Sequence, residues 1–134
     1  MYVVNRGLRQ ARADSIVVDR AASQPFFSRL TFTKVQGTTM TFYQNGNQLV
    51  QQVGGKTRVL SKHVKFLAFT LPRSDDLSIV SVSVTLEKNT GYWDPKRMAK
   101  VDQVILLPIP EANTRLAALR SGQVDWIEVP PPDG

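Results

Sequence analysis

Alternating apolar and polar side chains dominate residues 26–88 and predict β-strands that each bury one face. In the first of these strands Leu30 and Phe32 fall on the same side, which we expect to be the buried one. Strands are predicted at residues 30–35, 40–43, 48–53, 57–60, 64–71 and 80–87. Asn45-Gly46 stands between the second and third strands and favours the positive φ angles of a tight hairpin turn. The pattern therefore predicts an antiparallel β-meander over residues 26–88, with one apolar face that another element must cover.

Residues 89–134 follow a different pattern, which predicts a strand, a helix and a second strand. The apolar run 101–107 is short enough for a strand, and residues 124–129 predict another. Between them, Pro110 and Glu111 are typical of a helix start and Gly122 of a helix end. The apolar stripe expected on this helix consists of Ala112, Leu116 and Leu119. A helix that joins two neighbouring strands gives a parallel strand pair, so the predicted fold class is α+β, an antiparallel β-meander followed by a β-α-β unit.

The predicted organisation has three parts: a basic lead at residues 1–25, for which a short helix is one option, the sheet at 26–88, and the β-α-β piece at 89–134. Residues 1–88 contain twelve Lys and Arg against five Asp and Glu, a net charge of +7, whereas residues 89–134 contain five against six, a net charge of −1. The basic residues are scattered singly, without the clustered cations and interleaved aromatic rings typical of nucleic-acid-binding surfaces. We therefore expect a solvated basic surface, and nucleic-acid binding is the least favoured functional class.

Few residues in the sequence carry catalytic or metal-binding chemistry. The chain contains no cysteine and one histidine, His63, so a disulfide framework, a thiolate site, a histidine zinc site and a Ser–His nucleophile all lack the residues they need. Asp75 and Asp76 are adjacent and are typical of a turn between strands. Residues 54–57 (GGKT) lack the upstream glycine of a phosphate-binding loop. We expect a protein that is not an enzyme and that uses no metal and no cofactor.

The stretches 91–95 (GYWDP), 101–111 (VDQVILLPIPE) and 114–128 (TRLAALRSGQVDWIE) together resemble one piece of the family 5 extracellular solute-binding proteins, the peptide and nickel receptors of ABC importers. The resemblance implies that residues 89–134 correspond to part of the larger receptor lobe. Residues 89–93 read NTGYW where the family usually has Asn-Pro-x-Tyr-Trp. By this resemblance Tyr92, Trp93 and Trp126 are the candidate ligand-binding residues, and packing within the lobe is their alternative role.

Residues 26–88 are similar to the C-terminal sheet of type IV pilin-like proteins, the pseudopilins. The similarity rests on the strand pattern and on turn chemistry, as in residues 75–86 (DDLSIVSVSVTL). It implies a module that contacts its neighbours through sheet edges in a type IV pilus or type II secretion system. Pilins cover this sheet with a long N-terminal helix, which has no counterpart in residues 1–25.

Two functional hypotheses follow. The favoured one is a non-catalytic fragment related to a peptide-type receptor of an ABC import system, made from a truncated or fused reading frame, with a peptide or other small solute as ligand and an ABC permease as partner. The alternative is a pseudopilin-like assembly module with pilus-type partners. Both resemblances imply the cell envelope, periplasmic or extracellular. The apolar run at residues 1–4 is too short for an export signal or a membrane-spanning segment, so we expect neither in this sequence.

Overall fold

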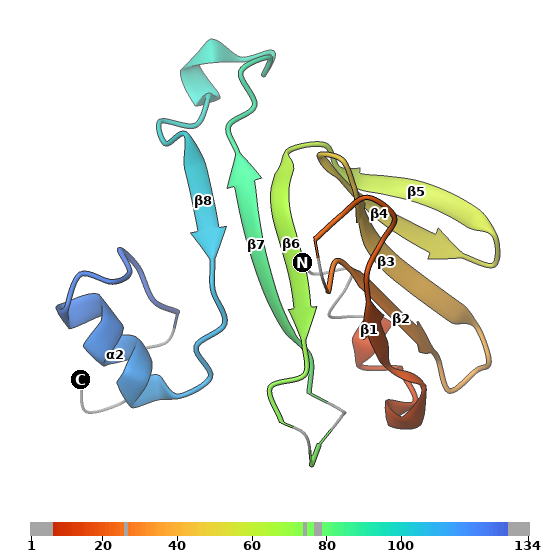
Figure 1. Cartoon of the computed structure of the whole chain (residues 1–134). Coiled ribbons are helices and arrows are strands. Elements are labelled where there is room, and N and C mark those ends of the chain that lie inside the picture. Colours follow the sequence, from red (N-terminus) through yellow and green to blue (C-terminus); the bar gives the residue numbers. More distant parts are fainter. Residues whose placement is uncertain (1–6, 26, 74, 77–78, 129–134) are drawn as a thin grey trace.

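The computed structural model describes residues 7–25, 27–73, 75–76 and 79–128, which include two antiparallel sheets and an α-helix of nine residues (Figure 1). The first sheet has the order β1-β2-β3-β4-β5 and the second β6-β7-β8. The strands are β1 (Val17–Asp19), β2 (Arg29–Thr33), β3 (Thr39–Asn45), β4 (Gln48–Val53), β5 (Lys56–Ser61), β6 (Val64–Thr70), β7 (Ser81–Glu87) and β8 (Gln103–Leu106). The helical elements are the 3-10 turns η1 (Ala13–Ser15) and η2 (Pro95–Arg97) and the α-helix α2 (Ala112–Arg120). The fold is therefore α+β.

The core lies between the two sheets and is built from alternate residues of their strands. Leu30 and Phe32 of β2 are both fully buried, which confirms the face predicted for this strand. Phe32 stacks on Phe42 of β3 with the ring centroids 6.1 Å apart. Leu67 and Phe69 of β6 complete this cluster and are also fully buried. Because rings and branched side chains from both sheets interlock here, the core ties the N-terminal strands to the second sheet.

The hairpin predicted at Asn45-Gly46 is confirmed. β3 pairs antiparallel with β4, and Asn45 lies opposite Gln48 at the end of the ladder. Gly46 has a φ angle of +56°, a conformation that glycine adopts without the steric cost that a Cβ would add. The two-residue turn therefore sets the register of this strand pair.

The single meander predicted over residues 26–88 is wrong, because the structure divides these strands between two sheets. β2 to β5 form the first sheet together with β1, a strand that lies in the predicted basic lead. β6 and β7 leave that sheet and supply Leu67, Phe69 and Val84 to its apolar face. The physical reason is burial, since the apolar face of the first sheet needs a cover and β6 and β7 provide it.

The second sheet also crosses residue 88, the boundary predicted between the two C-terminal parts of the chain. β7 pairs with β6 on one side and with β8 on the other, and Val84 lies opposite both Leu67 and Leu106. Figure 1 shows β8 and α2 on the side of β7 that faces away from the first sheet.

The predicted β-α-β unit is not formed. β8 and α2 are present, but residues 124–128 are not a strand, and Val129 lies outside the described residues. The backbone N–H groups of Gln123 and Val124 donate to the carbonyl of Ala118 at 2.9 and 3.3 Å, so the chain after the helix bonds to the helix end instead of to β8. No parallel strand pair occurs among the described residues.

The apolar stripe predicted for the helix is only partly correct. Ala118 is the buried residue of α2, while Leu119 is 36% exposed and Ala112 and Leu116 are half-buried. Gly122 ends the helix with a φ angle of +73°, which confirms the predicted left-handed cap. Within the described residues no helix is both long and apolar enough to cross a membrane.

Candidate functional site

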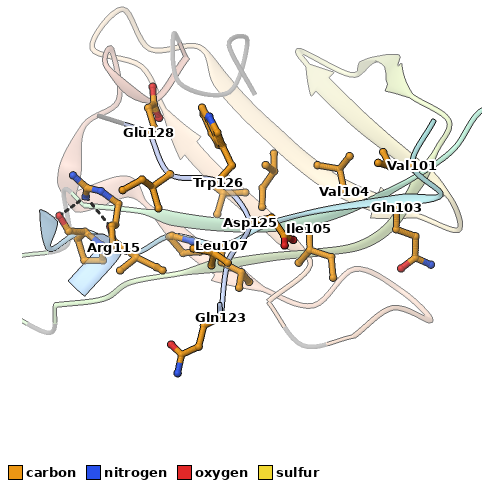
Figure 2. A pocket seen from close by; sticks show the side chains of 17 residues that line it. Val101, Gln103, Val104, Ile105, Leu107, Arg115, Gln123, Asp125, Trp126 and Glu128 are labelled. Carbon is orange, nitrogen blue, oxygen red and sulfur yellow. Dashed lines mark hydrogen bonds between the residues drawn. The ribbon is translucent and has the colours of Figure 1, made fainter. Parts of the chain in front are cut away.

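A groove of about 990 Å³ runs along β8. One wall is formed by residues 101–110, which include β8, and the other by residues 123–128 and Arg115 (Figure 2). Val82 of β7 contributes to the lining. The groove therefore lies between the edge of the second sheet and the segment for which a strand was predicted.

Apolar side chains dominate this groove and remain open to solvent. Ile105 is 60% exposed, Leu107 58% and Trp126 71%. Val104 and Leu106 point toward the core side of the sheet, yet they are 42% and 38% exposed because the first sheet does not reach as far as β8. A contiguous exposed apolar surface such as this one marks an interaction site in soluble proteins.

Arg115 lies at one end of the groove and stabilises the turn there. Its Nη1 donates to the carbonyl oxygens of Ile109 and Pro110 at 2.8 and 2.9 Å, which holds the turn between β8 and α2 (Figure 2). The Nε atom of Arg115 is buried and has no hydrogen-bond partner among the described residues. The guanidinium is thus hydrogen-bonded to the turn and stabilises one end of the groove.

Tyr92 and Trp93, two of the candidate ligand-binding residues, lie outside the groove. They sit in the loop between β7 and β8 with ring centroids 5.7 Å apart, and Trp93 is 79% exposed. Asn89 shapes this loop, since its backbone carbonyl accepts from the Tyr92 N–H at 3.3 Å and its side chain accepts from the Gly91 N–H at 3.1 Å. The structure therefore brings Trp126 to the groove and leaves the Tyr92–Trp93 pair in a separate, exposed loop.

The acidic and histidine residues weighed in the sequence show no catalytic arrangement. Arg73 binds Asp75 through two hydrogen bonds of 3.1 and 2.7 Å, and this contact lowers the pKa of the carboxyl group. His63 is half-buried, and its carbonyl accepts a hydrogen bond from Glu87 at 2.9 Å. Among the residues that the structure describes, no three His, Cys, Asp or Glu side chains come together as a metal site.

Sequence reasoning missed the groove itself. The signal lies in residues 104–107, whose continuous apolar run is typical of a strand buried on both faces. In the structure this strand is β8, at the edge of the sheet and exposed along its length. A two-sided apolar strand at a sheet edge indicates a missing neighbour, but the pattern alone does not show which strand will lie at the edge.

Comparisons with known proteins relate this part of the chain to one class. Residues 78–134 match the model of the bacterial extracellular solute-binding proteins, family 5 Middle. Over 50 residues the chain is 40% identical to the oligopeptide-binding protein OppA of Bacillus subtilis (strain 168), which amounts to 37% of this chain and 9% of that protein. The chain thus spans a small share of this relative's length. No solved structure is significantly similar to the chain.

These findings support a family 5 solute-binding segment in the C-terminal part of the chain. The matched region contains β7, β8, α2 and both tryptophans, so it includes the groove and the Tyr92–Trp93 loop. The resemblance of residues 26–88 to pseudopilins is not shown by the comparisons. The two-sheet arrangement also differs from the single sheet on which that resemblance rested.

Proposed function

We propose that residues 78–134 are a non-catalytic segment of a peptide-type solute-binding receptor that serves an ABC import system outside the cytoplasm. The observation that carries the proposal is the match of this region to family 5, together with its 40% identity over 50 residues to an oligopeptide-binding protein. The exposed apolar side chains along β8 support it, since a strand from a large lobe is expected to have apolar residues on both faces.

Trp126 is the residue of this segment best placed to contact a ligand. Its ring is 71% exposed and lines the groove, so an apolar or peptide ligand reaches it without any rearrangement of the core. Tyr92 and Trp93 form a second aromatic surface in the loop before η2. In our proposal these three residues are contact residues, and none takes part in chemistry.

Calorimetric titration of defined short oligopeptides into the intact chain tests the ligand class. We expect saturable heat that is lost in Trp126→Ala and retained in Val59→Ala, a control that removes an exposed side chain from β5 in the first sheet. Circular dichroism spectra of both variants establish that the fold is intact. Heat that is absent, or that is equal in Trp126→Ala and the control, contradicts ligand contact at this groove.

We further propose that the receptor segment was joined to the N-terminal sheet by fusion of reading frames. The family match begins at residue 78, shortly before β7, whereas β1 to β6 lie before it. The genomic sequence around the coding region tests this idea. Further receptor sequence in a neighbouring frame is the expected result, and its absence together with intact homologues of the same two-part order would contradict a fusion.

A further inference from the structure

Three of the four sheet edges in this structure are protected against pairing with another strand. β1 is only three residues long, and β5 carries Lys56 and Arg58 with exposed side chains. The outer edge of β6 is covered, because Phe69 N–H donates to Phe27 at 2.8 Å and Val64 N–H donates to Asn47 at 2.9 Å. Short strands, edge cations and covered backbone are the usual means of preventing edge-to-edge association.

The fourth edge, β8, is also short, with four residues, but it carries no cation, and no hydrogen bond from another described segment covers its outer backbone. Residues 103–109 contain no charged side chain, and Val104, Ile105 and Leu106 of this strand are apolar and exposed. Among the described residues, the strand partner of residues 103–106 is β7 alone. Its other side borders the groove, whose opposite wall is formed by residues 123–128. An apolar edge strand without cations or a covering segment indicates a surface suited to pairing with another strand.

From these observations we propose that two copies of the chain associate through β8, as antiparallel strands related by a two-fold axis at Ile105. This axis places Ile105 opposite its own counterpart on the outer face of the sheet. On the inner face it places Val104 opposite Leu106 of the second copy. The two-fold axis pairs each residue with the one that lies equally far from Ile105 on the other side. The product is one continuous sheet of six strands, a size that is common in globular proteins.

Charge favours pairing of two copies through β8 over pairing of two copies through β5. The basic residues are concentrated in residues 1–88, with a net charge of +7, whereas residues 89–134 have a net charge of −1. Figure 1 shows the first sheet on the far side of β6 and β7 from β8, so the two basic parts would point away from each other. Self-pairing through β5 would instead bring Lys56 and Arg58 of both copies together.

The charged residue nearest to β8 also stays far from its counterpart in the second copy. Asp102 would lie opposite Pro108 of the second copy, so the two Asp102 residues are about 20 Å apart along the strands. That distance exceeds the screening length of about 10 Å at moderate salt, and the two carboxylates therefore do not oppose pairing.

Sedimentation velocity of the intact chain, without peptide, tests the association. We expect a dimer in the unmodified protein and a monomer in Ile105→Lys, which places two like charges directly opposite each other. Ile105 is 60% exposed, so the substitution leaves the core of each copy intact. Val59→Lys on β5 is the matched control, also at an exposed valine on an edge strand, and it should remain a dimer.

The absence of native cysteine provides a second test of the register. Ile105→Cys should form an intermolecular disulfide under mild oxidation at least about tenfold faster than Val59→Cys, because directly opposite strand residues have the Cα separation that a disulfide requires. A monomeric unmodified protein, larger oligomers that Ile105→Lys does not reduce, or equal oxidation rates for the two cysteine variants would overturn the proposal. These readouts need no peptide, so they do not depend on the receptor proposal.

Discussion

Val84 lies directly opposite Leu67 across β7 and β6, and both side chains are buried, Leu67 completely. The receptor-like segment is thereby anchored in the same core as the N-terminal sheet. Leu67→Ala should destabilise the whole chain by about 2–5 kcal/mol, through lost burial and the cavity left behind. Urea denaturation followed by far-ultraviolet circular dichroism measures this change.

A matched control for Leu67→Ala exists on the surface. Leu119 in α2 is 36% exposed and lies outside the core cluster, so Leu119→Ala should cost well under about 1 kcal/mol. Two separate unfolding transitions, of which Leu67→Ala shifts only one, would contradict a core shared by both sheets.

Arg29 and Asp19 form a two-pronged contact between β2 and β1, with both hydrogen bonds at 2.6 Å. The contact lowers the pKa of Asp19 from its ordinary value of 3.8, chiefly through the hydrogen bond from Arg29. Because the folded pKa lies below the unfolded one, the stabilisation is present at neutral pH and is lost as the pH falls through the folded pKa. The side chains are 40% and 42% exposed, so the contribution should stay below about 1 kcal/mol.

Asp19→Asn tests this contact. The variant should be less stable than the unmodified protein at neutral pH, and the difference should close as the pH falls through the folded pKa of Asp19, where the native carboxylate is protonated as well. Thermal unfolding at several pH values measures the difference. A pH-independent difference for Asp19→Asn would assign the loss to packing and not to charge.

Gly46 should be the more sensitive of two exposed turn glycines. It has a φ angle of +56°, and a Cβ added there would meet no atom within 4 Å, so the cost of Gly46→Ala is backbone strain alone, about 1–2 kcal/mol. Gly91 lacks a positive φ angle, and its added Cβ would touch only the Asn89 side chain at 3.7 Å. Gly91→Ala should therefore leave the unfolding free energy nearly unchanged. Equal losses in the two variants would contradict the turn geometry at Gly46.

Local chemistry explains which elements could be predicted from the sequence. The Asn45-Gly46 turn, the buried face of Leu30 and Phe32, and the Gly122 helix end all depend on residues within a few positions of one another. The strand at 101–107 was also recognised from its own apolar run and appears as β8. In each case the signal and the structure it specifies lie in the same short stretch.

The parts that could not be predicted depend on contacts between distant segments. The division into two sheets is decided by Leu67 and Phe69 covering β2 and β3, which lie more than twenty residues earlier. Residues 124–128 have an apolar pattern suited to a strand, yet hydrogen bonds to Ala118 hold the start of this segment at the helix end. The sequence proposed Tyr92, Trp93 and Trp126 as one set of candidate site residues, whereas the structure places Trp126 alone in the groove. Periodicity carries no information about which of two competing partners a segment will meet.

Trp93 and Trp126 should contribute little to stability, because their side chains are 79% and 71% exposed. Trp93→Ala and Trp126→Ala are each expected to change the free energy of unfolding by less than about 0.5 kcal/mol. Phe42→Ala, at a fully buried ring, should cost about 3–5 kcal/mol in the same assay. Both tryptophans should also be open to quenching by acrylamide in the folded protein. A large stability loss in either tryptophan variant would show that the ring packs against the lobe, and it would remove that residue from the set of candidate ligand contacts.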